Sequence, residues 1–114
     1  MWSIEAGPGR VLIRPSGYLS LEESSVAADD FERELAGLEG SCVLIIDLSG
    51  LTGYDSEVRR VWQETMKRSR GMFRSIVWVC DKPLFRMVAA SVSLFTGIPG
   101  CVVGSHEDPL KFAV

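Results

Sequence analysis

The sequence predicts a single α/β domain with a mixed, mostly parallel sheet, and three observations lead to this prediction. Strand-like and helix-like segments alternate along the whole chain, in the order β-β-α-β-α-β-α-β. Residues 42–48, CVLIIDL, have no polar residue before Asp47, as is typical of an inner strand covered on both faces, and such strands are usually parallel. The chain has 114 residues, 46% of them apolar. This is the size of one compact domain, residues 1–114, with enough apolar side chains for one core.

The first third of the chain predicts a β-hairpin followed by a helix. The turn GPG at residues 7–9 separates two short strands, and the second strand carries the apolar run at 11–13. Ser20 and Glu23 have the spacing of a capping box, which predicts that a helix begins there and ends near residues 37–40. The apolar residues that recur on one face of this helix are Leu21, Val26, Ala27, Phe31, Leu35 and Leu38.

The remainder of the chain predicts two further helices and two further strands. A second helix begins at Ser56 and stops near Gly71, and its apolar stripe is Val58, Val61, Trp62, Thr65, Met66 and Ser69. Residues 75–80, SIVWVC, form a strand, and a third helix runs from Pro83 to Gly97. CVVGS at 101–105 is a short last strand, and the tail at 107–114 adds a helical turn.

The composition excludes several classes of function. Twelve basic and fifteen acidic side chains give a net charge of −3, which argues against a nucleic-acid partner because phosphate neutralisation drives such binding. The apolar stretches are too short to cross a bilayer, so no membrane insertion is expected. Cys42, Cys80 and Cys101 lie in or beside apolar strands and show no metal-site spacing, which favours core positions in a reducing cytoplasm. We expect no cofactor and no metal.

The order of elements, together with LIIDLSGLTGYDS at residues 44–56, resembles the STAS domain. This is the family of bacterial anti-sigma factor antagonists and of the cytoplasmic tails of sulfate transporters. In that family a central strand ends in an aspartate, a short loop follows, and an aspartate with a serine or threonine opens the next helix. The matching residues here are Asp47, the loop at 48–54, and the pair Asp55 and Ser56. FTGI at 95–98 is also similar to the family's helix ending, so the resemblance covers nearly the whole chain.

The sequence departs from the family pattern just after the acid–hydroxyl pair. Antagonists with a phosphorylation switch usually place a small residue and a glycine there, whereas this chain has Glu57, Val58 and Arg59. It therefore resembles the divergent, stand-alone bacterial members of the superfamily. For these members the resemblance implies the fold and a signalling or scaffolding role without a fixed reaction.

Ser56 has two interpretations. It caps the second helix, a role that Asp55 would fill equally well, because either side chain can accept a hydrogen bond from an unpaired N–H. Alternatively, as the resemblance implies, it accepts a phosphate from a partner kinase, and a helix start favours an anion. Asp55 and Glu57 oppose the added charge, whereas Arg59 and Arg60 offset part of it.

The leading hypothesis is a non-enzymatic protein-interaction module of bacterial signalling. Its partner would be a kinase-type anti-sigma factor or another regulator. Tyr54 is the expected exposed anchor, since a loop position needs no large ring for packing. The expected partner-binding residues are Thr52, Gly53, Tyr54, Asp55, Glu57, Arg59 and Arg60.

Three alternatives remain open. Residues 83–98, rich in Phe, Met and Leu, would flank an apolar pocket that holds a lipid or another small hydrophobic ligand. A homo-oligomer would form through the basic segment at 57–74, steered by charge toward the acidic first helix, or through an edge of the sheet. An enzyme is disfavoured, because the single histidine, His106, lies in a loop and no phosphate loop or nucleophile motif occurs.

Overall fold

The structure, a computed structural model, describes residues 1–38 and 40–112. The three helices and the strands of the main sheet lie within about three residues of their predicted positions, and residues 109–112 of the tail form a helical turn. The elements are β1 (Trp2–Gly7), β2 (Arg10–Pro15), β3 (Gly17–Leu19), α1 (Leu21–Ala36), β4 (Cys42–Asp47), β5 (Leu51–Tyr54), α2 (Val58–Arg68), η1 (Arg70–Met72), β6 (Phe73–Val79), α3 (Pro83–Thr96), β7 (Gly100–Val103) and η2 (Pro109–Phe112).

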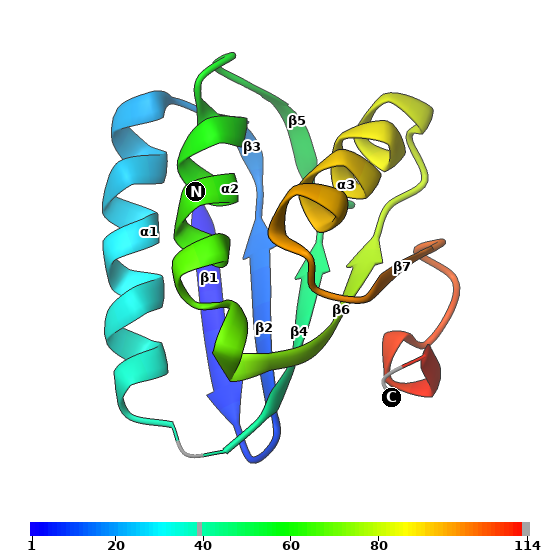
Figure 1. The fold of residues 1–114 in the computed structure, drawn as a ribbon. Coiled ribbons are helices and arrows are strands. Elements are labelled where there is room, and N and C mark those ends of the chain that lie inside the picture. The colour runs from blue at the N-terminus through cyan, green and yellow to red at the C-terminus, as the bar shows by residue number, and fades with distance from the viewer. Residues whose placement is uncertain (39, 113–114) are drawn as a thin grey trace.

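Five strands form the main sheet in the order β1-β2-β4-β6-β7. β1 is antiparallel to β2, and the other neighbours are parallel, with Ile46 of β4 in register between Ile13 of β2 and Trp78 of β6. The predicted mixed, mostly parallel α/β fold is therefore confirmed. From β2, the strands β4, β6 and β7 are added one after another toward the same edge of the sheet. Because each crossover is right-handed and runs in the same direction, the connecting helices lie on the same face of the sheet. Figure 1 shows α1, α2 and α3 together on that face.

Local signals explain where the helices begin and end. Ser20 caps α1, because its hydroxyl oxygen accepts a hydrogen bond from the Glu23 N–H at 3.1 Å, as the capping box predicts. Pro83 occupies the first turn of α3, where its missing N–H costs nothing. α3 ends at Gly97, whose φ of 74° is a left-handed conformation that glycine adopts without strain.

The core lies mainly between the sheet and the helices. Leu44 and Ile46 of β4 point toward the helices and pack in one cluster with Phe31 of α1, Met66 of α2 and Phe85 of α3. A second, smaller cluster occupies the opposite face of the sheet and consists of Val43, Ile45, Val77, Val79 and Val103. Residues 42–46 are buried throughout, which confirms β4 as the inner strand covered on both faces.

Two strands are absent from the sequence prediction. β3 and β5 pair in parallel as a separate two-stranded sheet, in which Tyr18 lies opposite Gly53 and Leu19 opposite Tyr54. The expected loop at residues 48–54 is thus partly a strand. Segments of three and four residues that contain a glycine are too short to show an alternating pattern, so the sequence gives no signal for them.

Candidate functional site

The candidate site is the turn between β5 and α2, which contains Asp55, Ser56 and Glu57. β5 ends at Tyr54, and α2 begins at Val58. The Val58 N–H donates to the Asp55 carbonyl oxygen at 2.9 Å, which closes the turn. The helix thus starts two residues later than the sequence predicts.

Asp55 connects this turn to the start of α1 rather than capping α2. One carboxylate oxygen accepts a hydrogen bond from the Tyr18 hydroxyl at 2.7 Å, and the other accepts one from the Leu21 N–H at 2.8 Å. These two bonds hold the pKa of the Asp55 carboxyl below its ordinary value, and the bond from Tyr18 has the larger effect. The same Tyr18–Asp55 hydrogen bond raises the pKa of the tyrosine hydroxyl. Asp55 therefore stays ionised and ties together β3, β5 and the first turn of α1.

Ser56 does not cap α2 either. Its side chain is exposed and makes no hydrogen bond within the described residues. The N-cap position belongs to Glu57, which is also exposed and makes no capping hydrogen bond. The cap interpretation of the pair is therefore wrong, because the turn places both side chains before the position from which a cap reaches the free N–H groups. Within the described residues, the positive end of the α2 dipole therefore has no side-chain capping hydrogen bond.

Tyr54 is not the exposed anchor that the sequence suggests. It is half-buried, and its ring centroid lies 6.1 Å from that of Phe85. The exposed aromatic residue beside the turn is Tyr18, whose exposed fraction is 59%. Its ring crosses Gly53 so closely that a Cβ there would lie 3.1 Å from it. Sequence reasoning missed Tyr18, because its nearness to the turn depends on the unpredicted pairing of β3 with β5.

An open groove runs beside the turn between β5, the start of α2 and the start of α3. Arg59 lies on one side with no ion pair in the described residues, whereas the neighbouring Arg60 pairs with Glu64 at 3.4 Å. On the other side, the Lys82 ammonium donates to the Leu51 carbonyl oxygen at 3.2 Å. The groove is lined by Tyr18, Thr52, Gly53, Tyr54, Ser56, Arg59, Lys82, Leu84 and Phe85. Four of the seven predicted partner-binding residues, Thr52, Gly53, Tyr54 and Arg59, thus line the groove, and Lys82 adds a second cation.

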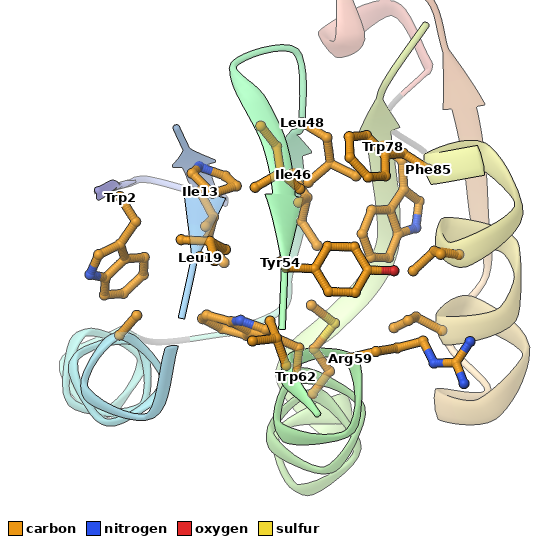
Figure 2. A pocket seen from close by; sticks show the side chains of 17 residues that line it. Trp2, Ile13, Leu19, Ile46, Leu48, Tyr54, Arg59, Trp62, Trp78 and Phe85 are labelled. Atoms are coloured by element: carbon orange, nitrogen blue, oxygen red, sulfur yellow. The ribbon is translucent and has the colours of Figure 1, made fainter. Parts of the chain in front are cut away.

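An apolar cavity lies behind the groove, between the sheet, α2 and α3. Figure 2 shows Tyr54 and Phe85 beside it, with Trp2, Trp62 and Trp78 around it. Its volume is about 80 Å³, and Tyr54, Arg59 and Phe85 line both the cavity and the groove. The structure therefore contains an apolar space next to the third helix, where the carrier hypothesis places one.

The loop after β7, which carries His106, is held in place by Asp81. His106 is exposed in the loop after β7, and beside it Asp81 accepts hydrogen bonds from the Ser105 hydroxyl and N–H. These two bonds keep the pKa of the Asp81 carboxyl below its ordinary value and fasten the loop to the end of β6.

Within residues 1–38 and 40–112, no group of histidine, cysteine, aspartate and glutamate side chains is arranged to hold a metal ion. No helix in the same residues is long and apolar enough to cross a membrane.

The fold resembles that of solved structures. An uncharacterized protein of the DUF3478 family with a SpoIIAA-like fold, from Shewanella loihica PV-4, matches with a TM-score of 0.76 and 17% identity, over 100% of this chain and 93% of that one. The anti-sigma factor antagonist SpoIIAA in its unphosphorylated form matches with a TM-score of 0.63 and 13% identity, over 98% of this chain and 94% of that one. This chain has a SpoIIAA-like fold. The predicted STAS-like architecture is confirmed at the level of the fold, while no protein-family model and no curated protein sequence matches the chain.

Proposed function

We propose that this SpoIIAA-like domain is a non-enzymatic protein-interaction module of bacterial signalling that acts in the cytoplasm. Its working surface, which we call the turn surface, consists of Thr52, Gly53, Tyr54, Asp55, Ser56, Glu57, Arg59 and Arg60, with Tyr18 added. The observation that carries this proposal concerns Ser56, which is exposed and, within the described residues, makes no hydrogen bond and lies beside a helix start without a side-chain cap. A kinase-type anti-sigma factor or another regulator is the proposed partner.

Phosphorylation of Ser56 is the proposed switch. A phosphate would bring about −1.5 to −2 charges and three acceptor oxygens to the start of α2, where the helix dipole favours an anion. Arg59, without an ion pair in the described residues, lies on the first turn of the same helix. Asp55 stays ionised and opposes the added charge, although its carboxylate oxygens accept hydrogen bonds from the Tyr18 hydroxyl and the Leu21 N–H. Glu57 remains as an opposing charge.

Intact mass spectrometry tests the switch. The protein is purified gently from its native host, and fragmentation then locates any added mass. A phosphate on Ser56 that is absent from Ser56→Ala protein supports the switch. Binding to a co-purified kinase-type regulator should be weakened by Ser56→Asp and retained by Ser25→Asp, a matched change of an exposed serine on α1. Regulator binding that both variants retain would refute the turn surface as the docking site.

A carrier of a small hydrophobic ligand is the second candidate function, and the apolar cavity is the observation that favours it. Its volume of about 80 Å³ is well below the ~300 Å³ at the lower end of ordinary ligand pockets. A lipid would fit only if α2 and α3 moved apart, so this function ranks second. Mass spectrometry under conditions that preserve complexes decides it, since a carrier retains a ligand of defined mass after purification.

A further inference from the structure

We propose that the outer face of α3 is a docking seam for an acidic amphipathic helix of a partner protein. This seam, which we call the α3 stripe, consists of Leu84, Met87, Ser91, Leu94 and Phe95. Met87, Ser91 and Leu94 do not line the groove beside the turn. The proposal therefore adds a second interaction surface and does not depend on Ser56.

The α3 stripe is the main apolar feature of the described surface. Seven large apolar side chains are exposed in the described residues, and four of them lie on α3. Leu84 is 66% exposed, Met87 71% and Leu94 86%, while Phe95 is 46% exposed. The opposite side of the helix is already buried on the sheet through Phe85, Ala89, Val92 and Thr96. α3 is therefore apolar on two faces, whereas a surface helix of a monomeric domain usually needs only one.

The spacing of the stripe suits another helix. Positions 84, 87, 91 and 94 are separated by steps of three, four and three residues, the spacing of the a and d positions along a coiled-coil seam. Ser91, the small member in the middle, lets a facing helix approach closely. A helix with the same apolar spacing would bury the stripe along the 14 residues of α3.

The charges beside the stripe favour an acidic occupant. The Lys67 ammonium of α2 lies 4.9 Å from the centre of the Phe95 ring, so a cation stands at the C-terminal end of the stripe. Arg59 and Lys82 line the groove together with Leu84 at its N-terminal end. Residues 82–106 contain no aspartate or glutamate. A partner helix with carboxylates beside its apolar seam would therefore meet opposite charge at both ends of α3.

The same charges argue against the other occupants. In a symmetric dimer built on α3, the cations of one copy would face those of the other. α1, the acidic helix of this chain, exposes a single large apolar residue in its described surface, Val26, and cannot fill the seam. Helices that lie on membranes carry lysine and arginine along their own polar face, whereas Arg86 is the single cation of α3.

The test uses a stapled, fluorescein-labelled helical peptide of 14 residues, matched to α3 in length. It carries leucines at the a and d positions and glutamates beside them. The control peptide has lysines in place of the glutamates. Fluorescence anisotropy should show that the full chain binds the acidic peptide and that salt weakens the binding. The lysine peptide should bind at least about tenfold more weakly.

Protein variants locate the binding. Met87→Glu and Leu94→Glu should each weaken acidic-peptide binding by about tenfold or more, because each removes apolar burial and adds a like charge. Val26→Glu, the same kind of change at an exposed position of α1, should leave it unchanged. Ser56→Ala should also leave it unchanged, which separates this surface from the turn surface. Circular dichroism and thermal melting confirm that each variant is folded.

Three results would overturn the proposal. The first is failure of the acidic peptide to bind, or binding that Met87→Glu and Leu94→Glu leave intact. The second is binding to phosphatidylglycerol vesicles that displaces the peptide, which would assign the stripe to a membrane. The third is a dimer in analytical ultracentrifugation that Leu94→Glu dissociates, which would assign the stripe to a second copy.

Discussion

Replacing Ser20 or Ser56 by alanine tests which of the two serines caps a helix. Ser20 and Ser56 both stand where the sequence predicts a helix start, but the structure gives a capping hydrogen bond to Ser20 alone, with the Glu23 N–H as donor. Ser20→Ala should lower the free energy of unfolding by about 1 kcal/mol, the usual cost of an N-cap hydroxyl. Ser56→Ala should change it by less than about 0.5 kcal/mol, since that hydroxyl makes no hydrogen bond in the part of the chain that the structure describes.

The assay is urea unfolding followed by circular dichroism. With a dependence on urea of about 2 kcal/mol per molar, the loss at Ser20 shifts the midpoint down by about 0.5 M. In thermal unfolding the same loss lowers Tm by about 4 °C. A midpoint for Ser56→Ala that falls as far as that for Ser20→Ala would show that Ser56 caps α2, and would remove the observation on which the proposed function rests.

Two further predictions concern the tie at Asp55 and the packing of α1. The lowered pKa of the Asp55 carboxyl means that its contribution to stability is complete above the unfolded value of about 3.8 and is lost as pH falls through the folded pKa. Below about pH 4, the free energy of unfolding measured with urea should therefore fall less steeply with pH in Asp55→Asn than in the unchanged protein. An equally steep fall in both proteins would contradict a stabilising role for the hydrogen bonds of Asp55. Phe31 is fully buried, with ring centroids 5.8 Å from Trp62 and 6.0 Å from Phe73. Phe31→Ala should cost about 3–5 kcal/mol in the same assay, and a loss below about 1 kcal/mol would contradict this packing.

The sequence predicts those parts of the fold whose signals are local. The capping box of Ser20 and Glu23 joins residues three apart, and the glycine that ends α3 follows the helix directly. The buried run of β4 is continuous in the sequence, so the inner strand is also predicted correctly. Each of these elements is determined by residues within a few positions of one another, which is the range over which periodicity and caps act.

The details of the site depend on contacts between distant residues, and these leave no local pattern. Asp55 accepts its hydrogen bonds from Tyr18 and Leu21, which are 37 and 34 positions away. The sequence suggests instead that Asp55 can cap α2, the helix that follows it directly. Tyr54 is held against Phe85, and the aromatic residue exposed beside the turn is Tyr18. The resemblance to STAS domains indicates the turn between β5 and α2 as the candidate site, but it does not indicate which of its side chains are free.

A pair of neighbouring alanines on α1 distinguishes a cavity that can accept a ligand from ordinary packing. Ala27 is 1% exposed and lines the apolar cavity, while Ala28 is 5% exposed and does not line it. Leucine suits a helix nearly as well as alanine, so Ala27→Leu and Ala28→Leu differ mainly in the space that the new side chain enters.

Ala27→Leu should fill part of the 80 Å³ cavity and stabilise the domain by about 0.5–2 kcal/mol, as cavity filling commonly does. Ala28→Leu should destabilise it by about 1–3 kcal/mol, because its side chain enters packed surroundings. Urea unfolding measures both values. Equal losses in the free energy of unfolding would mean that the cavity cannot accommodate the larger side chain at position 27. If Ala27→Leu also abolishes retention of a co-purified ligand while it raises stability, the chain is a carrier and the cavity is its binding site. If regulator binding is kept in the stabilised variant, the cavity is a packing defect and the function lies on the surface.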